Sequence, residues 1–161
     1  MTKKSSMALA LALTCCALGT AASAATTAGN FNVGVTLTPK CEIFTTGATS
    51  TITDLPMAYT SFQTTVSTGS TNFKVRCTNT QGYSLALDNA SVTDGTTGLA
   101  YTLNLTTGAT HTSAANASIA SLSGNGNSGQ TYYVHGTIAA NQDGTVTTGT
   151  ANNIRSLTIT Y

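Results

Sequence analysis

The sequence predicts an all-β protein built as an antiparallel sandwich, and three observations support this class. Threonine occurs 35 times among the 161 residues, and β-branched residues fit the pleated surface of a strand better than a helix. Apolar residues recur at every second position in several short runs, which predicts strands with one buried face. Clusters rich in glycine, asparagine and aspartate separate these runs, as expected for turns between antiparallel strands.

The composition also excludes several classes of function. Only 7% of the residues are charged and the formal net charge is +1, so the chain lacks the basic stripe that nucleic-acid binding requires. The hydrophobic share of 40% is higher than disordered chains have. With so few ionisable side chains, the sequence offers few candidates for a general acid or a general base. We therefore expect no enzyme, no cofactor, no metal and no small-molecule substrate.

The N-terminus is typical of a secretory signal peptide spanning residues 1–24. Two lysines precede an apolar run from Met7 to Leu18, and Ala22-Ser23-Ala24 provides a small-residue cleavage site. The run is too short to span a membrane, which takes about 20 residues. Cleavage would leave residues 25–161, enough for one domain of an exported protein.

The mature chain keeps two cysteines, Cys41 and Cys77. An even pair in an exported chain predicts one disulfide. The alternative is a metal site or a catalytic thiol, but no CxxC or Cys/His spacing supports it.

The predicted strands follow one another along the chain. Period-2 alternation covers six runs: Phe31–Leu37, Phe73–Cys77, Tyr83–Leu87, Leu99–Leu105, Tyr132–Ile138 and Leu157–Tyr161. Residues 112–122 come nearest to a helix, but Gly124 and Asn125 end that stretch early. An immunoglobulin-like sandwich needs seven strands, and these runs fall short of that number: five lie inside the domain, and the first, Phe31–Leu37, is a loose N-terminal candidate. The prediction is therefore an incomplete immunoglobulin-like sandwich that lacks its final strand.

A glycine-rich stretch imitates a cofactor motif. Gly124, Gly126 and Gly129 match the GxGxxG pattern of dinucleotide-binding proteins. That pattern works only where it opens a helix, and here the alternating run Tyr132–Ile138 follows. We interpret the stretch as a loop between strands.

The remaining ionisable residues make no convincing catalytic group. Asp88 and Asp94 bracket a turn, where aspartate side chains usually cap backbone groups. A glycosidase pair is the alternative. His111 lies in a loop and His135 falls on the polar phase of its strand, so both are expected to face solvent.

Several stretches together resemble the spore coat protein U family. Val75-Arg76-Cys77 followed by Tyr83–Asp88 resembles its second-cysteine strand and the next strand, and Leu99–Leu103 resembles its central strand. The C-terminal pattern of the family is matched by Val134–Ile138, Gln142 and Leu157–Tyr161, and its first cysteine strand by Phe31–Cys41. The chain departs from the family at His135 and Thr137, where tyrosine and arginine are usual.

The resemblance implies a shaft subunit of an archaic chaperone–usher pilus, supporting adhesion or biofilm formation at the cell surface. Such a subunit passes from a periplasmic chaperone to an outer-membrane usher and joins copies of itself or sibling pilins. Residues 25–38 would be the N-terminal donor extension and residues 39–161 the pilin domain. A non-polymerising secreted coat or matrix protein of the same fold, and a carbohydrate-binding adhesin, are the alternatives.

Two sets of residues are the predicted interaction sites. The donor side chains are Phe31, Val33, Val35 and Leu37, which share one face of an extended strand. The alternative places residues 31–38 in the first strand of their own domain. The predicted chaperone-docking edge is the last strand, with Leu157, Ile159 and Tyr161 on one face.

Overall fold

The computed structural model describes residues 26–44, 51–146 and 152–161. The predicted signal peptide, which contains Cys15 and Cys16, lies outside these residues, and so does Thr46-Gly47, one of the glycine-containing clusters expected to form turns between strands. The chain divides into two units, of which the first ends at Thr36 and the second runs from Leu37 to Tyr161. The strands all belong to the second unit.

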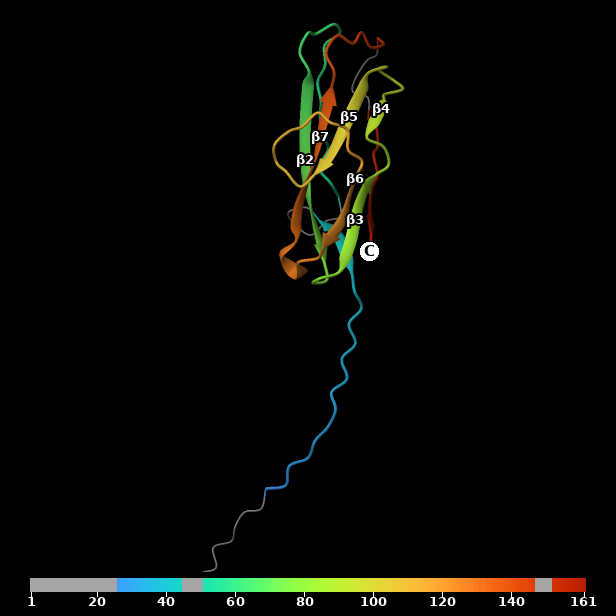
Figure 1. Cartoon of the computed structure of the whole chain (residues 1–161). Helices are drawn as coiled ribbons and strands as arrows, with labels where there is room; N and C mark the ends of the chain where they lie inside the picture. The colour runs from blue at the N-terminus through green and yellow to red at the C-terminus, as the bar shows by residue number, and fades with distance from the viewer. Residues whose placement is uncertain (1–25, 45–50, 147–151) are drawn as a thin grey trace, which may run out of the picture. The chain divides into compact units, whose positions relative to one another are not determined.

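The described residues contain eight strands and no α-helix. All strand pairs are antiparallel, in a five-stranded sheet A of order β1-β2-β7-β5-β4 and a three-stranded sheet B of order β6-β3-β8 (Figure 1). The strands are β1 (Cys41–Phe44), β2 (Ser67–Cys77), β3 (Gly82–Leu87), β4 (Ser91–Thr93), β5 (Ala100–Thr106), β6 (Ser118–Ser123), β7 (Gln130–Ile138) and β8 (Leu157–Thr160). The prediction of an all-β antiparallel protein is confirmed.

The core lies between the two sheets and consists largely of the residues that the alternation singled out. Sheet A contributes Phe73 and Val75 from β2, and sheet B contributes Leu85 from β3, each at most 1% exposed. Other buried members are Tyr83, Leu87, Leu103, Leu105, Tyr132 and Val134. Side chains from both sheets therefore share one apolar layer, which is the arrangement of a β-sandwich.

The predicted disulfide between Cys41 and Cys77 is present. The two residues are register partners on β1 and β2, and both are buried. The bond ties the first strand of the domain to the end of its longest strand.

Residues 51–66 form no strand, yet part of this segment covers the inner face of sheet A. Gly69 of β2 and Gly136 of β7 are register partners, and a side chain on either would meet Leu55 and Met57. The two glycines thus make a notch that the side chains of Leu55 and Met57 fill. Further along, Thr71 donates a hydrogen bond to the carbonyl of Thr53 (2.8 Å).

A long connection between β5 and β6 crosses the outer face of sheet A. Figure 1 shows it as the gold loop that passes in front of β7. Hydrogen bonds hold this loop, residues 107–117, to the sheet: Asn104 Nδ2 donates to the Ala114 carbonyl (2.5 Å) and Thr102 Oγ1 to the Ser113 carbonyl (3.3 Å). The loop then joins the edge of β5, where Asn116 bonds the backbone of Leu103 and Leu105.

Candidate functional site

Strand β8 forms one edge of sheet B. It pairs with β3 from Leu157↔Leu87 to Thr160↔Ser84, and in the described part of the chain no strand pairs with its other side. Leu157 and Ile159 are half-buried and pack against the core, while Thr158 and Thr160 are exposed. A strand edge without a partner presents a row of backbone donors and acceptors that can template another chain.

The predicted docking residues Leu157, Ile159 and Tyr161 are thus placed at this edge. The first two lie in β8, and Tyr161 follows the strand with 58% of its surface exposed. Sheet B has three strands where sheet A has five. An added strand beside β8 would extend the smaller sheet.

The predicted donor segment carries four large apolar side chains that are exposed. Phe31 is 85% exposed, and the values for Val33, Val35 and Leu37 are 73%, 87% and 72%. Residues 26–40 have no assigned secondary structure, and the domain's first strand begins at Cys41. The residues of this alternating run therefore belong to no strand of the two described sheets.

The acidic pair interpreted as turn-capping residues has that role. Asp94 is 8% exposed and accepts hydrogen bonds from the backbone nitrogen and the hydroxyl of Thr97, both at 2.6 Å. These bonds lower the pKa of Asp94. Asp88 accepts a hydrogen bond from the Asn89 backbone and pairs with Arg155 at 3.4 Å. Both carboxylates thus cap nearby backbone groups, and Asp88 also pairs with a residue near the C-terminus.

The glycine-rich stretch is a connection between β6 and β7. It contains a short 3₁₀ turn at Gly126–Ser128 and leads directly into β7. Gly124 packs so closely on Cys77 and the carbonyl of Thr78 that a side chain would clash there. The stretch opens no helix of the kind that holds a dinucleotide.

The expectation that both histidines face solvent is wrong. His135 does lie on the outer face of β7, in the phase opposite to Tyr132 and Val134, but it is only 1% exposed. His111 is half-buried beside it, with 5.2 Å between the ring centroids. The loop 107–117 covers this face, and no periodic pattern in the sequence predicts such a cover.

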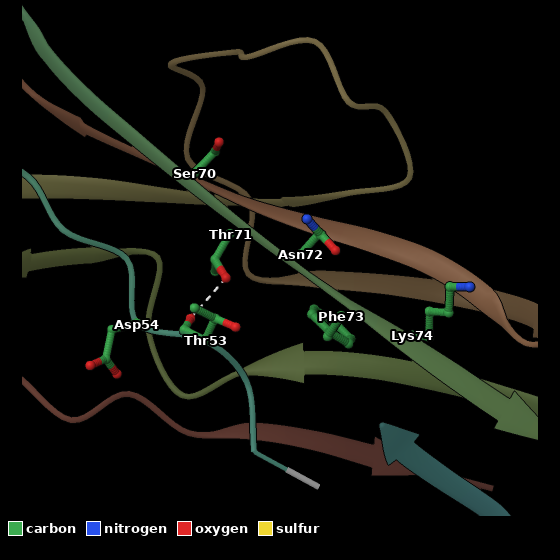
Figure 2. A pocket seen from close by; sticks show the side chains of 7 residues that line it. All are labelled: Thr53, Asp54, Ser70, Thr71, Asn72, Phe73 and Lys74. Atoms are coloured by element: carbon green, nitrogen blue, oxygen red, sulfur yellow. Dashed lines mark hydrogen bonds between the residues drawn. The ribbon is translucent and has the colours of Figure 1, made fainter. Parts of the chain in front are cut away.

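A shallow hollow lies between β2 and the segment at Thr53-Asp54. Figure 2 shows Asp54 and Lys74 at opposite ends of it, with the Thr71–Thr53 hydrogen bond between them. Its lining is polar and both charged side chains are exposed. The hollow holds no pair of groups suited to acid–base chemistry.

No family model matches the chain, and no curated protein matches it either. Within the described ranges, no helix is long and apolar enough to cross a membrane. In the same part of the chain, no three or more His, Cys, Asp or Glu side chains form a group that could hold a metal ion.

Proposed function

We propose that this chain is a structural subunit of an extracellular pilus, in which each copy donates an N-terminal strand to its neighbour. One pairing of features supports the proposal: β8 has a free edge beside a half-buried apolar face, and residues 31–37 carry exposed apolar side chains at every second position. Strand addition needs these two complementary parts, a sheet edge that lacks a partner and an extended segment with a matching period.

The proposed fold is an immunoglobulin-like sandwich whose final strand comes from another copy. A donated strand beside β8 would give sheet B a fourth strand. The apolar side chains of the donor would point towards the core, next to Leu157 and Ile159. The asparagine, glycine and threonine between them would face outwards.

The donor side chains are large enough to hold the assembly together. Full burial of one such side chain contributes about 1.5–3 kcal/mol, so four contribute roughly 6–12 kcal/mol. Backbone hydrogen bonds along the new strand pair add to this. A donor that leaves each copy and enters the next makes a head-to-tail contact that does not close on itself, which generates a filament.

The same edge accounts for the proposed partners during export. An unpaired β8 would promote aggregation before assembly, so a periplasmic chaperone would cover it by contacting Leu157, Ile159 and Tyr161. An outer-membrane usher would then bring the donor of the next subunit to this edge. These partners come from the resemblance to the spore coat protein U family.

A charge placed on the donor face tests the proposal. In the Val33→Asp/Val35→Asp variant the donor would have to bury two carboxylates, whereas Asn32→Asp/Thr36→Asp adds the same charge on the opposite face. We expect unheated denaturing gels of surface protein to show a ladder for the wild type and the control, and only monomer for the donor variant. A secreted coat protein without strand exchange would show no ladder in any of the three.

A further inference from the structure

Two neighbouring side chains on the outer face of sheet A each carry a buried polar atom without a hydrogen-bond partner. Asn104 of β5 and His135 of β7 are register partners, and directly opposed residues have Cβ atoms about 4.5–5.5 Å apart. Asn104 is 7% exposed and His135 is 1% exposed. Neither Oδ1 of Asn104 nor Nδ1 of His135 has a hydrogen-bond partner.

The hydrogen bonds of the same side chains define both atoms as acceptors. His135 Nε2 lies 3.1 Å from the carbonyl oxygen of Gly108. Because a carbonyl only accepts, Nε2 carries a proton, and in the neutral ring Nδ1 then keeps its lone pair. Asn104 donates through Nδ2 to Ala114, which leaves Oδ1 as an acceptor. Two acceptors cannot bond each other, and leaving such groups buried and unpaired costs about 1–3 kcal/mol each.

The ring of His111, which lies beside that of His135, offers a third acceptor nitrogen. Its Nε2 lies 3.1 Å from the carbonyl oxygen of Gly136, so the lone pair of its ring again belongs to Nδ1. The centroids of the two imidazoles are 5.2 Å apart. Two imidazoles on one tetrahedral ion, with metal–nitrogen bonds of about 2.0–2.1 Å, have centroids separated by roughly the same distance.

We propose that His111, His135 and Asn104 bind a divalent transition-metal ion of the zinc type between loop 107–117 and sheet A. Neutral imidazole is a preferred ligand of such ions, whereas magnesium and calcium prefer sites built from oxygen alone. In both histidines the other ring nitrogen donates to a backbone carbonyl, the usual arrangement around metal-bound histidine. Stacking of Tyr133 on His135, at 5.9 Å, holds the ring plane.

The proposed site is separate from strand donation. It lies on the outer face of sheet A, whereas the free edge of β8 belongs to sheet B. Its effect would be to fasten the loop to the sheet, since two ligands come from strands and one from the loop. A bound ion that prefers the folded state raises the unfolding midpoint with its concentration.

Zinc titration of the metal-free mature protein, purified without a histidine tag, tests this inference. We expect one Zn²⁺ per chain by calorimetry, a raised unfolding temperature with Zn²⁺, and no response to Mg²⁺. His111→Gln, at the half-buried position, should weaken binding at least about tenfold. His135→Gln should also weaken Zn²⁺ binding. If this buried substitution prevents folding, the Zn²⁺ affinity of His111→Gln alone tests the site.

Two results would overturn the proposal. Wild-type protein that binds no Zn²⁺ would mean that a buried water, donating to both acceptors, occupies the space. Unchanged Zn²⁺ binding in His111→Gln would place the ion elsewhere. Copper offers a direct signature, because the chain has only two histidines: spin resonance of bound Cu²⁺ should show two imidazole nitrogens in the wild type and one in His111→Gln.

Discussion

Gly69 and Gly136 face each other across β2 and β7, and together they make room for two side chains of a segment that forms no strand. A Cβ on Gly136 would lie 2.7 Å from the sulfur of Met57, the far end of a flexible side chain. A Cβ on Gly69 would lie 2.6 Å from the backbone carbonyl of Pro56, which cannot move alone. The notch thus fixes how residues 55–57 cover the core.

Alanine at these two positions should destabilise the protein to different degrees. Overpacking usually costs about 1–3 kcal/mol. We expect Gly69→Ala at the upper end of that range, because backbone must shift, and Gly136→Ala at the lower end. Urea unfolding of the purified mature protein measures both. Gly82→Ala is the control, since nothing lies within 4 Å of its Cβ, and equal midpoints for all three variants would contradict the notch.

Removal of the disulfide should cost about 2–5 kcal/mol of unfolding free energy, the usual range for exported domains. The Cys41→Ala/Cys77→Ala variant should therefore unfold at lower urea than the wild type and accumulate to a lower level. Wild-type protein treated with a reductant before unfolding should match the variant. Two reactive thiols in the untreated native protein would contradict the pairing.

Alkaline pH should weaken the fold through Tyr132. Its hydroxyl is buried, lies 2.6 Å from that of Tyr83 and donates to Gln130, and burial raises its pKa far above the ordinary value. The folded state then keeps a proton that the unfolded chain loses above about pH 10. The contribution of Tyr132 to stability should therefore be constant below about pH 9 and be lost as the pH rises above about 10.

Substitution of Tyr132 by phenylalanine gives the control for this alkaline effect. Tyr132→Phe should be less stable at pH 8, because a hydrogen bond is lost, but its stability should fall less steeply above pH 10. Burial also raises the pKa of Tyr101, so some slope remains. Parallel profiles for the wild type and Tyr132→Phe between pH 8 and pH 11 would contradict the assignment.

Deletion of residues 159–161 should abolish accumulation of the subunit in the periplasm. The deletion removes Ile159 from the core face of β8 and Tyr161 from the proposed docking edge. Immunoblots of periplasmic extracts measure the level. Deletion of residues 26–28, outside the donor positions, is the control. Normal amounts of soluble truncated protein would contradict the proposed role of this edge.

The alternation in the sequence predicted the long strands, but it did not predict β6, because a bulge interrupts the period of two in that strand. Ile119 and Leu122 both pack against the core although they are three residues apart, because the register with β3 shifts between Leu85 and Tyr83. Ser121 there has a positive φ of 58°. A bulge adds one residue to a strand and breaks its period of two, so no period-based argument could find β6.

The buried histidine was missed for a different reason. The alternation placed His135 on the outer face of its strand, which is where it lies. The outer face of a sheet is usually exposed to solvent, and here only the path of loop 107–117 shields it from solvent. That path depends on hydrogen bonds of Asn104 and Thr102 to distant carbonyls. Such long-range bonds leave no local pattern in the sequence.

Strand donation by residues 31–37 can be tested within a single chain by moving the donor segment to its C-terminus. A chain of residues 39–161 followed by a flexible linker and residues 26–38 can fill its own free edge. We expect a soluble monomer whose unfolding free energy exceeds that of the same chain with Val33→Asp/Val35→Asp by about 3–6 kcal/mol, the contribution from burial of two valines. Equal unfolding free energies for the two chains would contradict strand donation by residues 31–37.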